Sequence, residues 1–125
     1  MRRILFYTLL LSYFMLTSCE TFDNYGYPGK VTFDRDGGTK TIDGGNSFYH
    51  VEINDYNGNG NAKITDGEND TIIATYDWLS VKYRWCRDKH IILEALPNTT
   101  GKKRTLYVYG MVDDRSADIK VVQEK

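Results

Sequence analysis

The chain has 125 residues, of which 41% are hydrophobic, 26% charged and 14% aromatic, and its formal net charge is -1. This length and composition are typical of one globular domain and leave no room for a second independent one. Sixteen Lys and Arg residues face seventeen Asp and Glu residues, so the basic excess that binds nucleic acid is missing and we expect no nucleic acid partner.

The first 18 residues have the pattern of a secretory signal peptide. Arg2 and Arg3 form a cationic start, and residues 4–16 form an uncharged, mostly apolar run. As a helix this run spans only about 20 Å, less than the roughly 30 Å hydrocarbon core of a bilayer. We therefore predict a cleaved signal peptide over residues 1–18 rather than a permanent transmembrane helix.

The segment Leu16-Thr17-Ser18-Cys19 resembles the lipobox of bacterial lipoproteins. The resemblance implies that the Cys19 thiol receives a diacylglycerol and that cleavage occurs just before it. It also implies a membrane partner. The short acidic stretch 20–24 resembles the export signals of some Bacteroidota lipoproteins, so we expect the outer membrane, with the protein on its periplasmic or cell-surface side. The alternative is a plain signal peptide with an incidental cysteine.

Residues 19–27 are expected to form a polar tether between the lipid and the domain. Within it, Tyr25 and Tyr27 stand beside Pro28 and are predicted to pack against the domain rather than to bind a ligand. If Cys19 carries lipid, Cys86 has no disulfide partner and is expected to be a small apolar residue rather than a reactive thiol.

From Pro28 onward, short runs rich in Val, Ile, Thr, Tyr and Phe alternate with Gly, Asn and Asp turns, which predicts an all-β chain. We expect seven to eight strands, arranged as an immunoglobulin-like β-sandwich. The runs that fit the pattern are 30–34, 39–42, 47–54, 62–65, 71–76, 79–84, 90–96, 104–112 and 118–123.

Side chains alternate between the two faces of a strand, so the apolar positions of each run predict the core. In the run 47–54, Phe48, His50, Glu52 and Asn54 fall on one face, and Tyr49, Val51 and Ile53 on the other. The inward residues predicted in the later runs are Leu79, Val81, Tyr83, Ile91, Leu93, Ala95, Leu106, Val108, Ile119 and Val121.

The order and spacing of these pieces resemble the BACON domain, an immunoglobulin-like sandwich of Bacteroidota proteins often attached to carbohydrate-active enzymes. The matching segments are 31–33, 36–42, 77–81, 97–101 with Arg104, and 119–123. The resemblance covers most of residues 28–125 and implies association with carbohydrate or mucin, or a role as a spacer. The chain departs from the family pattern in an enlarged middle, 54–70, and at Tyr83-Arg84-Trp85-Cys86.

One segment, residues 55–66, fits the spacing of a twelve-residue calcium loop. Its oxygen ligands would be Asp55, Asn57, Asn59 and Asp66, with Gly60 at the position of the sharp turn. Lys63 and the small number of carboxylates argue for weak calcium affinity. The alternative is an ordinary turn, because Asn-Gly supplies the residues that tight turns require.

A platform of aromatic side chains is the second candidate site, because sugar rings stack on flat aromatic surfaces. If Leu106 and Val108 point inward, Tyr107 and Tyr109 point to solvent, and Trp85 and Tyr76 fall near strand ends. Exposed aromatics in a sheet also arise from cross-strand pairing alone, which is the alternative.

Catalysis has little support in the sequence. The histidines, His50 and His90, lie inside predicted strands without a nucleophile motif. We therefore expect a non-catalytic, lipid-anchored envelope module that possesses no cofactor and binds a glycan. The alternatives are an accessory lipoprotein that binds another envelope protein, and an adhesion-type sandwich stabilised by calcium.

Overall fold

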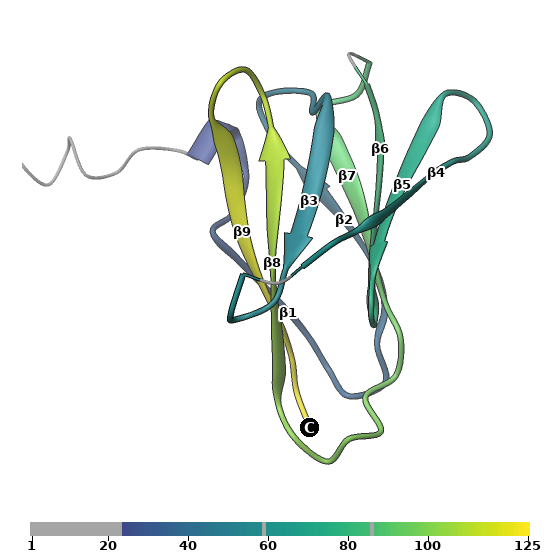
Figure 1. Cartoon of the computed structure of the whole chain (residues 1–125), viewed down its shortest axis with the longest axis vertical. Coiled ribbons are helices and arrows are strands. Elements are labelled where there is room, and N and C mark those ends of the chain that lie inside the picture. The colour runs from purple at the N-terminus through teal and green to yellow at the C-terminus, as the bar shows by residue number, and fades with distance from the viewer. Residues whose placement is uncertain (1–23, 59, 86) are drawn as a thin grey trace, which may run out of the picture.

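The computed structural model describes residues 24–58, 60–85 and 87–125, which form two facing β-sheets (Figure 1). The prediction of an all-β sandwich is confirmed, with nine strands rather than seven to eight. The elements are η1 (Asn24–Gly26), β1 (Lys30–Phe33), β2 (Gly38–Asp43), β3 (His50–Asn54), β4 (Lys63–Asp66), β5 (Thr71–Tyr76), β6 (Leu79–Arg84), β7 (His90–Ala95), β8 (Arg104–Met111) and β9 (Ser116–Gln123).

The two sheets have four and five strands. The four-stranded sheet has the order β1-β9-β8-β3, and the five-stranded sheet has the order β2-β7-β6-β5-β4. β1 pairs with β9 in parallel, and all the other pairs are antiparallel. The first and last strands are therefore neighbours in the four-stranded sheet. The chain crosses to the five-stranded sheet after β1 and after β3, and it returns after β2 and after β7.

Strict alternation in the strands builds the core between the sheets. In β6, β7 and β8 the buried positions recur at every second residue, as expected for strands with one face on a core. All ten inward residues predicted for the later strands are buried. Each large aliphatic among them stabilises the fold by roughly 1.5–3 kcal/mol through removal from water.

The predicted alternation is wrong at the start of the third run. Phe48 is only 1% exposed whereas Tyr49 is 45% exposed, the reverse of what strand parity required. The regular strand begins at His50, and before it the Phe48 ring packs on the Tyr27 ring at 4.6 Å between centroids. A Cβ added to Gly110 would meet the Phe48 ring at 2.2 Å, so this glycine makes the space into which Phe48 turns.

Polar side chains connect the sheets and loops at the end of the sandwich that carries the 96–103 loop. Gln123, at the end of β9, is fully buried, and its Nε2 donates to the carbonyls of Leu96 (2.7 Å) and Asp34 (3.2 Å). Its Oε1 accepts a hydrogen bond from Arg104 Nε at 2.8 Å. The Arg104 guanidinium in turn lies 4.7 Å from the ring centroid of Trp78, within the range of a cation–π contact.

Replacing Gln123 by Leu should lower the free energy of unfolding by about 3 kcal/mol, because buried carbonyls and the Arg104 Nε–H lose their partner. Urea unfolding measures this loss. The matched control is Lys120→Ala on the exposed face of the same strand, which should change stability by no more than about 0.5 kcal/mol. Equal losses in the two variants would contradict this role of Gln123.

Candidate functional site

The structure separates the four aromatic residues predicted to form a glycan platform. Tyr107 and Tyr109 share the outer face of β8 and are half-buried. Tyr76 packs partly against the core, so it does not belong to an outer platform. Because Tyr76 pairs with Leu79, the first residue of β6, it lies at the opposite end of the β5–β6 hairpin from Trp85, which follows β6.

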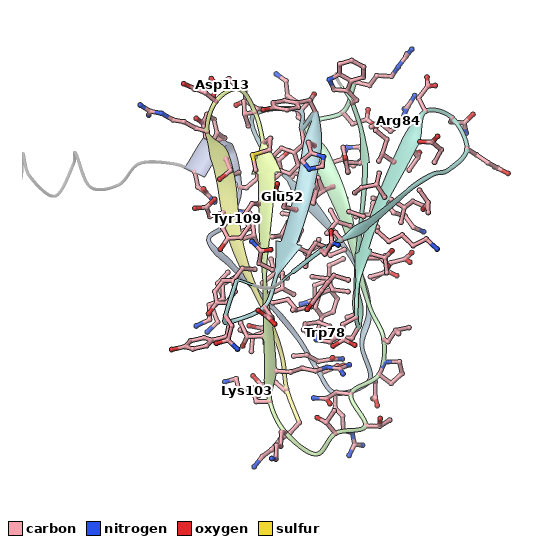
Figure 2. All side chains as sticks on the ribbon, in the orientation of Figure 1. Glu52, Trp78, Arg84, Lys103, Tyr109 and Asp113 are labelled. Atoms are coloured by element: carbon pink, nitrogen blue, oxygen red, sulfur yellow. The ribbon has the colours of Figure 1, made fainter. Side chains whose placement is uncertain are left out.

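Tyr107 and Tyr109 have polar neighbours on both adjacent strands. Tyr109 lies opposite Glu52 of β3 and Asp118 of β9 (Tyr109 and Glu52 are labelled in Figure 2). Burial raises the pKa of the Tyr109 hydroxyl, and the nearby Asp118 and Tyr107 add to this effect. Neighbours on both sides are what cross-strand pairing on a sheet surface produces, which is the alternative that the sequence left open.

Trp85 presents an open aromatic surface at the other sheet. Its side chain is 58% exposed, and it borders a hollow of about 480 Å³. The hollow lies between the β4–β5 turn and the turn that follows β6. Besides Trp85, the residues around it are Asp66, Gly67, Asp70, Thr71, Ile72 and Arg87.

The β4–β5 turn, one wall of this hollow, is held in place by its own backbone and by Arg84. The Gly67 amide donates to the Thr71 carbonyl at 2.7 Å, and Asn69 and Asp70 adopt left-handed φ angles of 57° and 62°. Arg84 Nε donates to the Asn69 carbonyl at 3.0 Å. Short polar residues tolerate this conformation better than other side chains, so the sequence Gly-Glu-Asn-Asp suits the turn.

The other wall carries the basic groups. Arg87 Nη2 lies 3.4 Å from Asp70 Oδ2, which links the two turns across the mouth of the hollow. Both side chains are well exposed, so this ion pair adds little stability. The neighbouring Asp88 is fixed by Arg84 Nη1 at 3.3 Å. Figure 2 shows Arg84 and Trp78 toward opposite ends of the molecule.

The chemistry of the hollow suits a carbohydrate. An exposed indole offers a flat apolar surface for the C–H face of a sugar ring. Carboxylates accept hydrogen bonds from hydroxyl groups and a guanidinium donates them, and here Asp66, Asp70 and Arg87 stand beside Trp85. Of the four aromatic residues predicted for the platform, Trp85 thus has polar groups suited to binding around it. These groups come from Asp66, Asp70 and Arg87, which the platform prediction did not include.

The proposed calcium ligands do not come together among the described residues. Asp55 Oδ1 accepts a hydrogen bond from the Asn57 amide at 2.9 Å, and the Asp55 carbonyl accepts one from Gly58 at 3.1 Å. β4 then runs extended from Lys63 to Asp66, which carries Asp66 about 10 Å further along. Figure 1 shows β4 leading away from this turn toward the β4–β5 turn.

Residues 55–62 instead connect the two sheets. A Cβ on Gly60 would lie 1.9 Å from the Ile53 carbonyl oxygen, so glycine is required here because the chain passes directly against the end of β3. Asn59, the third predicted ligand, lies outside the described residues. Across residues 24–58, 60–85 and 87–125, no three His, Cys, Asp or Glu side chains are grouped closely enough to hold a metal ion.

The two histidines each lie near one carboxylate on an outer surface. His50 Nε2 is 3.8 Å from Glu52, and His90 Nε2 is 4.0 Å from Asp88. These are partly exposed pairs at strand starts.

The end of the predicted tether is fastened to the sandwich from Asn24 onward. Asn24 Nδ2 donates to the Asp118 carbonyl at 2.9 Å, and Asn24 Oδ1 accepts from the Asp118 amide at 3.0 Å. The Tyr25 carbonyl accepts from the Gly45 amide at 2.7 Å. Asn24, Tyr25 and Gly26 all have positive φ angles, so this tight turn is held by its contacts with the domain.

Tyr27 completes this attachment. Its ring is 4% exposed, stacks on Phe48 and covers Gly44, where an added Cβ would lie 2.1 Å from the ring. Its hydroxyl donates to the Asn46 carbonyl at 2.5 Å. The packing predicted for the two tyrosines occurs, with Tyr25 partly buried against the core. Only residues 20–23 therefore separate Cys19 from Asn24, where the attachment to the sandwich begins.

Cys19, the predicted lipid acceptor, and Cys86 both lie outside the described residues. In the part of the chain that the structure describes, no helix has the length and apolar character needed to cross a membrane.

No family model and no curated protein matches the chain. One similar solved structure is the NMR structure of a protein from Bacteroides thetaiotaomicron, with 16% sequence identity and a TM-score of 0.46. The similarity covers 79% of this chain and 82% of that one.

Burial, with a smaller effect from the Asp43 charge, raises the pKa of Tyr27 to about 12. In the unfolded chain a tyrosine titrates near pH 10. The contribution of Tyr27 to the free energy of unfolding should therefore be fully present below about pH 10 and should be lost as the pH rises to about 12. Tyr27→Phe should be about 1 kcal/mol less stable at neutral pH, because it lacks the hydrogen bond to Asn46. On alkalinisation, the free energy of unfolding of Tyr27→Phe should fall by about 2–3 kcal/mol less than that of the wild-type protein.

Urea unfolding at a series of pH values tests this prediction. Because the burial of Tyr83 and Tyr109 also raises their pKa values, Tyr27→Phe should keep part of the alkaline loss. The same pH dependence in both proteins would contradict the burial of the Tyr27 hydroxyl.

Proposed function

We propose that the protein is a non-catalytic module, anchored to the outer membrane by lipid on Cys19, that binds a glycan in the hollow beside Trp85. The observation that carries the glycan site is the 58% exposed Trp85 at the edge of a hollow with Asp66, Asp70 and Arg87. The lipid anchor is supported by the signal pattern of residues 1–18 and by the lipobox resemblance.

Trp85 offers a ligand more open aromatic surface than Tyr107 and Tyr109 do. A ligand gains most where an aromatic surface is open and convergent polar groups fix its orientation. Tyr107 and Tyr109 are half-buried among their strand neighbours, so less of each ring remains for stacking. The hollow combines the open ring with both acceptors and donors of hydrogen bonds.

An alternative is that the same end binds another envelope protein. Trp and Arg dominate the energetics of protein interfaces, and Trp85 and Arg87 are both exposed here. Co-purification with one partner, together with no binding on a glycan array, would favour this alternative.

The anchor is tested by Cys19→Ser. This change removes the thiol that would receive the diacylglycerol, so the protein should move from the membrane fraction to the soluble fraction. Mass spectrometry of the wild-type N-terminus should show acyl chains on Cys19, each buried methylene contributing about 0.8 kcal/mol to membrane attachment. An unmodified and uncleaved N-terminus on the wild-type protein would contradict the anchor.

The glycan site is tested by Trp85→Ala on a glycan array, with residues 20–125 as the soluble protein. Affinity for the bound glycan should fall at least about tenfold, because truncating a central aromatic in a binding site typically costs 2 kcal/mol or more. The melting temperature should stay nearly unchanged, since this side chain is mostly exposed.

The matched control is Tyr56→Ala, which removes an aromatic that is 84% exposed and does not border the hollow. This variant should bind as wild type does. A second control, Tyr107→Ala with Tyr109→Ala, separates the two surfaces: if it loses binding and Trp85→Ala does not, the site is the tyrosine face.

A further inference from the structure

The hollow and the N-terminal attachment lie at the same end of the sandwich. The Gly45 amide donates to the Tyr25 carbonyl at 2.7 Å, and the adjacent Gly44 amide donates to the Lys89 carbonyl at 2.7 Å. Lys89 closes the turn that begins with Trp85 after β6. Two consecutive backbone hydrogen bonds thus connect the attached N-terminal segment to the Trp85 turn over roughly 10 Å.

Figure 1 shows the same arrangement at the level of the elements. η1, the turn after β6 and the β4–β5 turn lie at one end, and the C-terminus and the 96–103 loop lie at the other. The strand register agrees, because Asn24 binds Asp118 near the start of β9 whereas Gln123 ends that strand at the far end.

The tether is short compared with the body. Residues 19–23 place Cys19 at most about 17 Å from Asn24, even when fully extended. Along β9, Gln123 lies a further 17 Å or so beyond Asp118, and the 96–103 loop extends past it. An anchor on Cys19 therefore restrains Asn24, at the same end as Trp85, to within about 17 Å of the lipid attachment point, whereas no such restraint acts on the far end.

Electrostatic attraction does not bring the Trp85 end toward the membrane. In the turns at the Trp85 end, four exposed acidic residues outnumber three exposed basic ones, so this end is not attracted to an anionic membrane surface. The acidic residues are Glu68, Asp70, Asp113 and Asp114, and the basic ones are Arg87, Lys89 and Arg115. The covalent lipid must hold this end at the headgroups. Within the hollow, Asp66 and Asp70 outnumber Arg87, which favours an uncharged sugar over a phosphorylated or acidic one.

We propose that the anchored protein turns its Trp85 hollow toward the bilayer and binds the uncharged saccharide headgroup of a glycolipid in that membrane. This inference rests on the proposed function, because it requires both the Cys19 lipid and the sugar site. A headgroup sugar rises from the surface directly below the hollow. A long soluble polysaccharide would have to enter the narrow space between the protein and the headgroups.

The orientation is tested with the lipidated full chain in vesicles that contain spin-labelled headgroups. Trp85 is 58% exposed at the membrane end, and Trp78 is 4% exposed toward the other end, so the two tryptophans act as internal references. The spin label should quench Trp85 fluorescence several-fold more than Trp78 fluorescence. The difference between wild type and Trp85→Phe gives the Trp85 signal, and Trp78→Phe gives it independently if that variant folds.

The ligand class is tested in vesicles made from polar lipids of the producing cell's outer membrane, either complete or with the glycolipid fraction removed. In the complete vesicles, a sugar in the hollow should reduce acrylamide quenching of Trp85 by about twofold or more. A ligand in a pocket contacts most of the pocket's surface, so the bound sugar should cover the Trp85 ring and exclude acrylamide from it. The protection should disappear in the depleted vesicles and in Asp70→Asn.

Each failure identifies a different step. Equal quenching of both tryptophans by the spin label would overturn the orientation. Equal acrylamide quenching in complete and depleted vesicles, or equal binding of soluble polysaccharide by the anchored and the unanchored protein, would overturn the glycolipid ligand. A chain that does not float with the vesicles would overturn the lipid anchor itself, and this inference with it.

Discussion

The buried side chain of Gln123 joins the two sheets through a hydrogen bond to the Leu96 carbonyl, a link that no strand pairing provides. It belongs to the four-stranded sheet, yet it donates to a carbonyl that follows β7 of the five-stranded sheet and to another that follows β1. Arg104 satisfies its oxygen and covers Trp78. A buried amide without these partners would be costly, so the loops at this end must adopt one arrangement when the sandwich closes.

At the opposite end the two sheets are joined by rings rather than amides. Tyr27 and Phe48 stack between Gly44 and Gly110, neither of which leaves space for a Cβ. This packing fixes the N-terminal segment against the loop after β2, and through Gly44 it fixes the turn that carries Trp85. The position of the candidate binding site relative to the N-terminal segment therefore depends on a small apolar cluster and two backbone hydrogen bonds.

Strand parity was sufficient to predict the fold class and the inward residues of β6 to β9, because alternation is a local property of each strand. It failed at Phe48, where the chain is not yet a strand and long-range packing on Tyr27 decides the side. It could not group the aromatic residues either, since Trp85 follows β6 of the five-stranded sheet whereas Tyr107 lies in β8 of the four-stranded sheet. The burial of Gln123 had no local signal, because polar residues near strand ends are normally exposed. Asp70 and Arg87, separated in sequence, meet only because β5 pairs with β6.

The parallel pairing of β1 with β9 has a mechanical consequence for a chain held by its N-terminus. Tension applied through residue 24 first loads the Asn24 amide contacts and the ring stack behind them. If these yield, the load passes to β1, whose four residues run alongside β9 in the same direction. Their hydrogen bonds are then sheared together rather than opened in succession, so the strand pair nearest the N-terminal segment resists separation as a unit.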